Sequence, residues 1–408
     1  MGRDMVSRAL WASVLCLHAA GAAAQGQALT LAEVLARARD QAPLVVSARL
    51  AVEETRGRVV GASVRSQINP DFDVYGGRRT GPGGNYTDFQ LGVGQAFEPP
   101  SRRAARLAGA NAAVAQGTAS VDEVTRQVLR DAATAFFRVV YANERIALLD
   151  AAQRLATNVY TIADRRFRAG DIAVLDVNIA RAALARVRAD REAAEATKAI
   201  ALGDLRQLVR VDGDLTVTGS LVSPPTPVDL AAALQSAQLR PELRTLEAAT
   251  QEAEADLRYG LSLAKPQFGV AARYSQEEGD RILLGGLTVT LPVFAKGQEQ
   301  QAVATARVTR LRTELEAARA RVQTEVRAAF DAYERRRSAL RILETDGTPS
   351  LDENEQLTTR SFDVGQIGLP DLLLIRREIL DTRFQYLDAL LEAALARIDL
   401  DASAAMLR

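Results

Sequence analysis

Side chains that could carry out catalysis are scarce in this chain, and their positions are informative. The 408 residues include one Cys and one His, and these are Cys16 and His18. The single Trp, Trp11, lies in the same short segment. Thiolates and imidazoles are common nucleophiles, general bases and ligands of zinc and copper. A mature chain that lacks this segment would have neither.

The N-terminal segment has the features of a secretory signal peptide. Arg3 and Arg8 precede an apolar run over residues 9–17, and Ala22-Ala23-Ala24 resembles a cleavage site. We therefore expect residues 1–24 to be a signal peptide and the mature chain to begin near Gln25. Lipidation of Cys16 is the alternative, but the bulky Leu15 precedes it where a small residue is preferred. The apolar run is too short for a membrane span.

Signal cleavage would exclude several classes of function. The mature chain would have no disulfide, no cluster of soft metal ligands, and no Cys-His or Ser-His-Asp catalytic group. Carboxylates remain, but none form a pair in a context that indicates a cleft. Lys plus Arg equals Asp plus Glu at 51 each, so charge does not favour a nucleic-acid partner. We expect no catalytic residues, no cofactor and no metal site.

One pattern, R-x-F-x-x-G-x-I-x-x-x-D, occurs twice, with its central glycines 195 positions apart. The copies consist of Arg165, Phe167, Gly170, Ile172 and Asp176, and of Arg360, Phe362, Gly365, Ile367 and Asp371. Each Gly predicts a helix C-terminus, because Gly adopts the left-handed conformation without a Cβ clash. The Asp six residues later is typical of the first turn of a following helix. Each copy therefore predicts a helix-turn-helix tip.

Two stretches without Gly or Pro, residues 118–169 and 298–346, predict helical rods of about 75 Å each. Their apolar residues recur at spacings of three and four, which favours a coiled-coil-like seam over a simple antiparallel bundle. The seam residues are Val121, Val124, Val128, Ala132, Phe136 and Val139 in the first rod, and Val308, Leu311, Leu315, Ala318, Val322, Ala329 and Tyr333 in the second. The sequence Asp346-Gly347-Thr348-Pro349 should interrupt the second helix.

Each rod follows two segments in which apolar and polar or Gly residues alternate, and each pair of segments predicts a hairpin. The strands lie around residues 71–74 and 88–97 in the first half, and 267–274 and 283–291 in the second. The intervening residues, 78–85 and 275–280, are polar and predict loops.

The order helix, hairpin, long helix, tip, helix therefore occurs twice. Pro43 and Pro70 match Pro241 and Pro266 at nearly the same offset as the glycines, which indicates an ancient duplication. We expect a first repeat over residues 25–213, a linker over 214–228 with a short strand at 215–221 and a stiff Pro-rich connector at 224–227, and a second repeat over 229–408.

Strands that are apolar on one face and polar on the other suit a barrel wall with lipid outside and water inside. Four strands cannot close a barrel, so the pattern requires several copies, and two or three would both suffice. A soluble four-stranded sheet that caps a helical bundle is the alternative. The export signal and the long helices favour the barrel wall.

These features resemble the outer membrane efflux protein family, whose type member is TolC, over essentially the whole mature chain. Residues 290–297, Thr-Leu-Pro-Val-Phe-Ala-Lys-Gly, are similar to a segment that this family has at its second strand-to-helix junction. Residues 95–103, Gln-Ala-Phe-Glu-Pro-Pro-Ser-Arg-Arg, are similar to the corresponding stretch of the CzcC-like heavy-metal branch, with departures at Pro100 and Ser101.

The resemblance implies a mainly α fold with a small β part: an internally duplicated α-barrel of long coiled-coil helices, continued by a transmembrane β-barrel with four strands per chain and closed by trimerisation. It implies location in the cell outer membrane, with extension into the periplasm. The implied partners are two further copies, outer membrane lipid, a periplasmic adaptor protein and an inner-membrane efflux pump. The ten motif residues would lie at the periplasmic end, where the charged ones would contact the adaptor.

Asp371 is the candidate for the constriction that closes the tunnel, because a ring of carboxylates repels itself and binds cations. Relatives carry a second acid three residues later, but Leu374 is found here. The branch resemblance implies efflux of cobalt, zinc or cadmium with a proton-driven pump. Multidrug efflux and type I secretion are alternatives within the same architecture. A periplasmic adaptor is a further alternative, although an adaptor would have one helical hairpin and not two full repeats.

Overall fold

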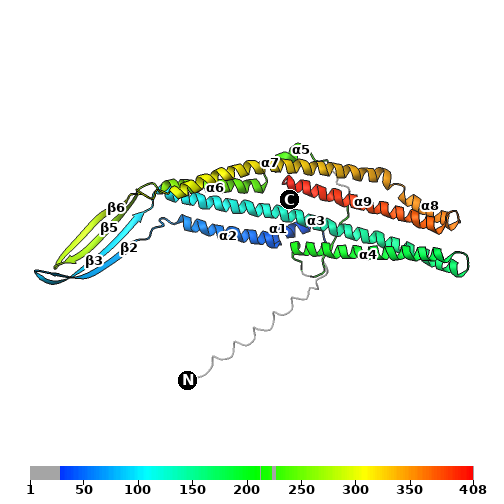
Figure 1. The fold of residues 1–408 in the computed structure, drawn as a ribbon, viewed down its shortest axis with the longest axis horizontal. Helices are drawn as coiled ribbons and strands as arrows, with labels where there is room; N and C mark the ends of the chain where they lie inside the picture. The colour runs from blue at the N-terminus through cyan, green and yellow to red at the C-terminus, as the bar shows by residue number, and fades with distance from the viewer. Residues whose placement is uncertain (1–27, 212, 223–226, 408) are drawn as a thin grey trace, which may run out of the picture.

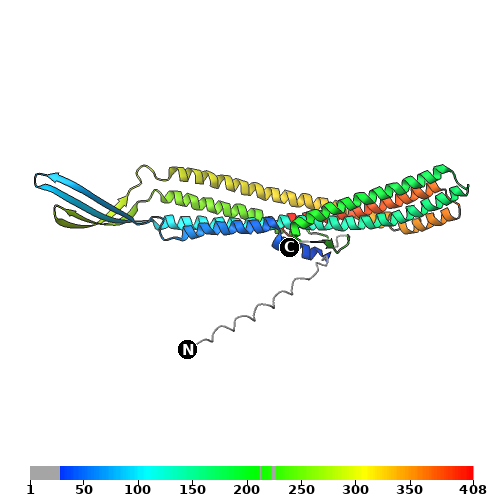
Figure 2. The same ribbon diagram turned by 90° about the horizontal axis from the view of Figure 1, so that it is seen from below.

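The computed structural model describes residues 28–211, 213–222 and 227–407. The expected signal peptide, Cys16 and most of the Pro-rich connector lie outside these residues. The molecule is a long curved rod, with a narrow sheet at one end and paired helices at the other (Figures 1 and 2).

The predicted order of elements is present in both halves. The first half contains α1 (Leu31–Gln41), α2 (Pro43–Ser63), β2 (Asp71–Gly81), β3 (Gly84–Phe97), α3 (Pro100–Arg168) and α4 (Val174–Val209). The second half contains α5 (Leu230–Ala237), α6 (Pro241–Ser262), β5 (Gln267–Glu277), β6 (Asp280–Thr290), α7 (Gln298–Ile342), α8 (Leu351–Asp363) and α9 (Leu369–Ser403). Pro43 and Pro241 begin corresponding helices, where the missing N–H of proline costs nothing.

The helices form a curved layer around two long members, α3 and α7. Nearer the sheet, α6 packs between α3 and α7, and α2 lies along the other side of α3. Farther from the sheet, α9 takes the place of α6, and α4 packs along α3 (Figure 2). Each long helix therefore spans two tiers and is joined in each tier by a shorter helix.

Helix α3 is 69 residues long and starts well before the Gly-free stretch from which its rod was predicted. Gly109 and Gly117 lie within this helix, and each faces a neighbouring helix at short range. A Cβ on Gly109 would lie 3.5 Å from the Ala255 Cβ of α6, and one on Gly117 would lie 3.3 Å from the Val52 Cγ2 of α2. These glycines allow α3 to pack closely against α2 and α6.

The predicted seams are confirmed by burial. Val128, Ala132, Phe136 and Val139 of α3 are buried in the largest core, which also contains residues of α1, α4 and α9. In α7, Tyr333 is fully buried in a second core with residues of α5, α6 and α9. Apolar burial along these seams is the main force that holds the helices side by side.

The predicted interruption of the second long helix is confirmed. Helix α7 ends at Ile342, a single π-helical turn covers Leu343–Gly347, and α8 begins at Leu351. Helix α3 continues unbroken at the corresponding level. The second half alone therefore has a joint above its tip.

The four long strands form one antiparallel sheet in the order β2-β3-β5-β6. Its register places Phe72 opposite Val93, Phe97 opposite Phe268, and Val270 opposite Leu287. One face consequently carries nearly all the large apolar side chains, and these are exposed: Phe72, Val74, Phe89, Val93, Phe97, Phe268, Val270, Leu283, Leu287 and Val289. Tyr75, Ile282 and Leu284 are exceptions on the opposite face.

The predicted hairpin loops were too long. Strands β2 and β3 continue to Gly81 and Gly84, so the residues from Arg78 to Gly81 are paired with those from Gly84 to Thr87. Strands β5 and β6 likewise extend to Glu277 and Asp280. The second turn consists of Glu278 and Gly279, both with positive φ, as in the two-residue turns that match strand twist. Polar composition suggested loops, but ladder hydrogen bonding continues to the turns.

The opposite face of the sheet is polar. Asp71 and Asp73 lie across Gly94 and Gly92 of β3, so close that a Cβ on either glycine would collide with a carboxylate. Arg79 pairs with Asp88 at 2.8 Å, Glu278 at 3.0 Å and Glu277 at 3.3 Å. This face is suited to contact with water.

The linker strand is shorter than predicted and has a partner that was not predicted. Strand β4 (Thr216–Val217) pairs in parallel with β1 (Ala28–Leu29). Two-residue strands have no detectable alternation, which explains why β1 was missed. None of the helices in the described part of the chain is both long and apolar enough to cross a membrane.

Candidate functional site at the helical tips

The first motif copy forms the turn that was predicted. Helix α3 ends at Arg168, Gly170 has φ +85°, and α4 begins at Val174. The Asp171 and Gly170 N–H groups donate to the carbonyls of Arg166 and Phe167 at 2.8 and 2.9 Å. This pair of hydrogen bonds is the Schellman motif. Asp176 lies in the first turn of α4, as expected.

The second copy repeats this geometry. Gly365 has φ +77°, and the Gln366 and Gly365 N–H groups donate to the carbonyls of Ser361 and Phe362 at 2.8 and 3.1 Å. Asp371 lies in the first turn of α9. The glycines of both copies therefore end one helix, and the aspartates lie in the first turn of the next, where the helix dipole favours a carboxylate.

The two tips lie side by side at the end of the molecule farthest from the sheet (Figures 1 and 2). They share a small core to which α3, α4, α8 and α9 all contribute. It consists of Val159, Ala163, Val177, Ala180, Phe362, Leu369 and Leu372, with Ile172 and Ile367 packed against it. This core joins the first hairpin, α3–α4, to the second hairpin, α8–α9.

The two phenylalanines of the motif have different environments. Phe362 is 9% exposed and belongs to the tip core, whereas Phe167 is 41% exposed. The guanidinium of Arg166 lies over the Phe362 ring, 5.4 Å from its centroid. Val174 and Leu175, which follow the first turn, are exposed as well, and Val364 is exposed on the second tip. The motif positions are equivalent in sequence but not in burial.

The charged motif residues are on the surface. Arg165, Arg360 and Asp371 are exposed, and Asp176 is half-buried. Arg168, close to the first motif glycine, pairs with Asp164 at 2.8 Å. Within the described ranges, the Asp371 side chain has no ion pair in the single chain. Leu374, three residues beyond Asp371, is also exposed.

Two arginines of α9 hold the second hairpin together, and sequence reasoning missed both. Arg383 pairs with Asp352 and Glu355 of α8, each at 2.7 Å, and Arg376 donates to the Thr359 hydroxyl at 3.2 Å. Burial lowers the pKa of Arg376, although Glu355 and Asp363 oppose this effect. A signal was available, because Arg181 lies five residues after Asp176, just as Arg376 follows Asp371.

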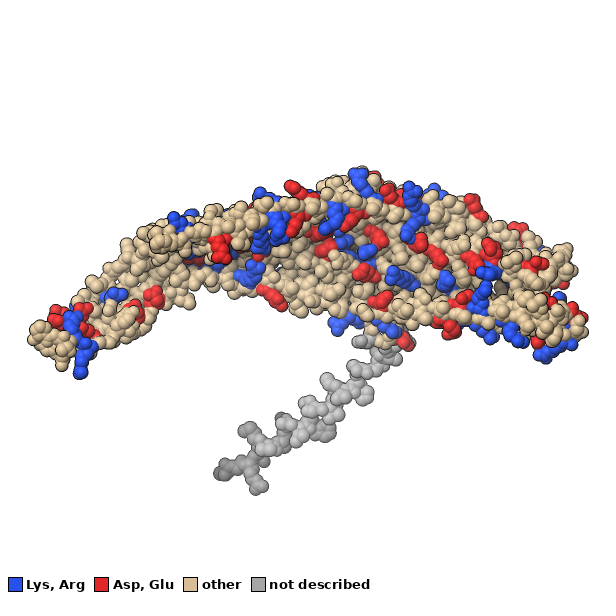
Figure 3. Space-filling view, in the orientation of Figure 1, with Lys and Arg blue, Asp and Glu red and all other residues tan. Residues whose placement is uncertain are grey.

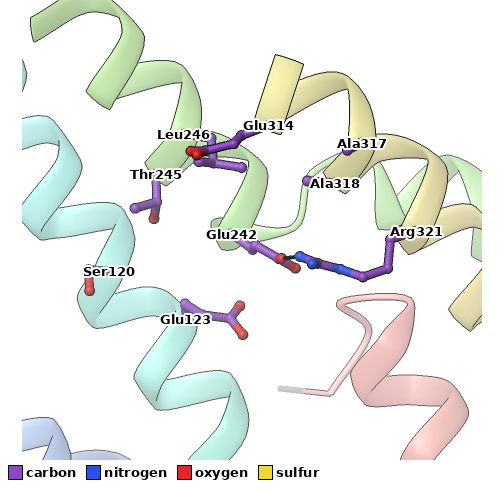
Figure 4. A pocket seen from close by; sticks show the side chains of 9 residues that line it. All are labelled: Ser120, Glu123, Glu242, Thr245, Leu246, Glu314, Ala317, Ala318 and Arg321. Carbon is purple, nitrogen blue, oxygen red and sulfur yellow. Dashed lines mark hydrogen bonds and ion pairs between the residues drawn. The ribbon is translucent and has the colours of Figure 1, made fainter. Parts of the chain in front are cut away.

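A second candidate site is a hollow of about 460 Å³ between α3, α6 and α7 (Figure 4). Its three acids are neutralised by arginines: Glu242 pairs with Arg321 and with Arg240, Glu123 pairs with Arg126, and Glu314 pairs with Arg310. Burial raises the pKa of Glu123, but the hydrogen bond and charge of Arg126 outweigh it and hold the pKa below its usual range. The arrangement offers no free carboxylate pair for a cation or for acid–base chemistry.

In the part of the chain that the structure describes, no group of three or more His, Cys, Asp or Glu side chains could hold a metal ion. The tips carry exposed apolar and charged side chains, and one face of the sheet is apolar and exposed.

Known proteins match this chain in sequence and in overall fold. The model of the outer membrane efflux protein family matches residues 34–209. The chain is 25% identical over 311 residues to the cobalt-zinc-cadmium resistance protein CzcC of Cupriavidus metallidurans, which covers 72% of this chain and 71% of CzcC.

Solved structures share the fold at low identity. The CmeC outer membrane channel of Campylobacter jejuni has a TM-score of 0.77 at 16% identity, over 92% of this chain and 85% of CmeC. The open state of the MtrE outer membrane channel of Neisseria gonorrhoeae has a TM-score of 0.73 at 20% identity, over 93% of this chain and 89% of MtrE. Residues 34–209 are therefore similar in sequence to the outer membrane efflux protein family, and the chain has the fold of the solved outer membrane channels CmeC and MtrE over more than nine-tenths of its length.

Proposed function

We propose that three copies of this chain associate side by side into one continuous duct from the periplasm to the exterior. The observation that carries the proposal is the sheet: its large apolar side chains share one exposed face, and its edge strands β2 and β6 are each paired on one side only within the described residues. Unpaired edges of 11 residues are costly to leave open. Side-by-side closure pairs β6 of one copy with β2 of the next and turns the apolar face toward lipid.

The assembly is tested by fractionating cells and analysing the protein with and without heating. We expect a heat-stable trimer in outer membrane fractions and discrete single-channel currents from the purified protein in planar bilayers. A soluble periplasmic monomer would contradict the proposal.

The duct would work with a periplasmic adaptor and an inner-membrane pump, which supplies the energy. The adaptor would dock at the tips, because Phe167, Val174, Leu175 and Val364 expose apolar surface at that end of the single chain. Arg165 and Arg360 would add charged contacts at the same end. The mechanism requires no covalent chemistry, because the substrate diffuses along a water-filled path.

We further propose that Asp371 forms part of the gate at the tips. Three copies would bring three exposed carboxylates toward one axis, where their repulsion and affinity for cations would control passage. The π-helical turn between α7 and α8 is a joint about which the second hairpin could move when the adaptor binds. The first hairpin, built on the continuous α3, would stay in place.

Asp371→Ala should change the single-channel behaviour of the purified protein. We expect a larger closed-state current and weaker block by divalent cations, because the ring of negative charge is removed. Asp176→Ala is the matched control, since Asp176 occupies the same motif position on the first tip. An Asp371→Ala channel with unaltered closed-state current and cation block would contradict the gate role.

The cargo we propose is heavy-metal cations of the cobalt, zinc and cadmium type. The support is the similarity to CzcC and the polar sheet face with Asp71, Asp73 and Asp88, which suits passage of cations. A deletion strain should become sensitive to these metals, and expression of the intact chain should restore resistance. Sensitivity to a dye panel alone would indicate multidrug efflux, and loss of a secreted polypeptide would indicate type I secretion.

The duct should conduct metals without binding them tightly. Isothermal titration of the purified protein with cobalt, zinc or cadmium should show only weak binding, about that of a generic acidic surface, because its described residues contain no Cys or His and no group of carboxylates that could hold a metal ion. A stoichiometric site with micromolar or tighter affinity would contradict this expectation.

A further inference from the structure

The apolar face of the sheet ends at a defined level near the hairpin turns. On the central strands, Phe89 and Tyr274 are the last large apolar residues of that face, and Thr87 and Gln276 follow them toward the turns. On the edge strands, Val74 and Leu283 are the last, and the charged residues that follow on the same face are Arg78 and Arg281. Aromatic residues at the limit of an apolar band are typical of the membrane–water interface.

The opposite limit of the band is equally clear. Phe72, Phe97 and Phe268 lie on the same face near the helices. From Phe97 to Phe89, the band covers about nine residues of β3, which is at the short end of the roughly 9–11 residues that a tilted strand uses to cross a bilayer. The turns lie at the end farthest from the helices (Figure 1), so Arg78 and Arg281 belong to the outer side of the membrane.

Arg78 and Arg281 differ from the neighbouring arginines in their contacts. Both are exposed, and neither has an ion pair with any described residue. Arg79, one residue along β2 and therefore on the polar face, is held by three carboxylates. Arg273, also on the polar face, lies within hydrogen-bonding distance of the Gln90 side-chain amide. Figure 3 shows basic and acidic side chains gathered at this end of the sheet.

The two arginines lie on the edge strands, which meet if copies associate side by side. This part of the inference rests on the proposed function. Arg78 is on β2 and Arg281 is on β6, so pairing of β6 with β2 of the next copy brings them to the same outer face at each junction. Two guanidinium groups near each other repel unless an anion lies between them. Arginine binds phosphate in a bidentate manner and is weakly hydrated, which suits a lipid interface.

We propose that Arg78 and Arg281 of adjacent copies bind the phosphate groups of an anionic glycolipid headgroup in the outer leaflet. The ligand would sit on the lipid-facing surface at each junction, just beyond Phe89 and Tyr274. It would neutralise the paired arginines and link neighbouring copies.

The test measures binding of lipid A to the purified trimer in neutral detergent. Bisphosphorylated lipid A should bind the unmodified trimer and raise its dissociation temperature, whereas lipid A without phosphates should bind much more weakly. Each basic residue near an anionic surface contributes about fivefold in affinity, so Arg78→Gln with Arg281→Gln should weaken binding about 30-fold. Arg78→Lys with Arg281→Lys should keep most of the affinity. Arg273→Gln is the control on the polar face and should leave binding unchanged.

Trimer formation and conductance of every variant are measured before lipid binding. A chain that forms no trimer contradicts the proposed function. An intact, conducting double Gln variant with unchanged lipid A affinity contradicts this inference alone. Equal binding of phosphate-free lipid A, or displacement of lipid A by an equimolar amount of inorganic phosphate, would also overturn it.

Discussion

Phe362→Ala should release the second hairpin from the first. The ring is 9% exposed and packs among residues of α3, α4 and α9. Its loss should cost about 3–5 kcal/mol, as for other buried Phe→Ala changes. Helix α8 has only 13 residues and follows the π-helical joint, so its polar contacts with Arg383 and Arg376 of α9 are the main interactions left to oppose its detachment. The expected result is local opening of α8 while the rest of the chain stays folded.

The opening is measured by thiol labelling at an introduced Thr358→Cys, whose parent side chain is buried in α8. A destabilisation of about 3 kcal/mol corresponds to a labelling rate about 100-fold higher when labelling follows the population of the open form. If the second hairpin carries the gate, the closed-state current should rise in the same variant. The first result depends only on the tip core, and the second also depends on the proposed function.

Phe167→Ala is the matched control, because Phe167 has the same motif position on the first tip but is 41% exposed. We expect labelling at Thr358→Cys to stay within about twofold of the parent, since a partly exposed ring contributes less apolar burial. If the two Ala variants label equally fast, the tip core does not hold the hairpins together.

Gly297→Ala should prevent assembly of the heat-stable trimer. Gly297 precedes the first residue of α7 with φ +77°, and a Cβ there would lie 2.6 Å from the Gly260 carbonyl oxygen and 2.9 Å from the Leu263 Cβ. The left-handed conformation costs about 1–2 kcal/mol for a residue with a Cβ, and overpacking adds about 1–3 kcal/mol. The colliding oxygen belongs to the backbone of α6 and cannot rotate away.

The expected readout is loss of the heat-stable trimer from outer membrane fractions together with a lowered melting temperature. Gly279→Ala separates the two costs, because Gly279 has φ +99° but a Cβ added there would meet no atom within 4 Å. That variant should lose only about 1–2 kcal/mol and still assemble. A Gly297→Ala protein as stable as Gly279→Ala would show that the α6–α7 junction tolerates the contact.

Much of the architecture was predictable because its signals are local and periodic. The duplicated motif predicted two Schellman turns, since the left-handed conformation at Gly170 and Gly365 depends on the glycines themselves. Alternation predicted which side chains share a face of the sheet, since a pleated strand permits only two faces. The sequence Asp-Gly-Thr-Pro at residues 346–349 predicted the interruption of the long helix that ends at Ile342. These features require no knowledge of distant contacts.

Other features depend on contacts between residues far apart in sequence. The start of α3 was misjudged because Gly109 and Gly117 lower helix propensity locally but allow close packing against α6 and α2. The paired lengths of the hairpins were underestimated because ladder hydrogen bonds do not depend on side-chain polarity. Strand β1 was missed because its partner β4 is almost two hundred residues away.

The sequence by itself determined the repeat, the tips, the alternating strands and the near absence of catalytic side chains, because each depends on residue type and short-range spacing. Only the tertiary structure decided that Phe362 is buried while Phe167 is exposed, and that Arg78 and Arg281 share the apolar face without an ion-pair partner among the described residues. Equivalent positions in a duplicated chain have the same local preferences. Their burial differs because each tip packs against a different set of neighbours, and such packing is a property of the assembled helices and strands.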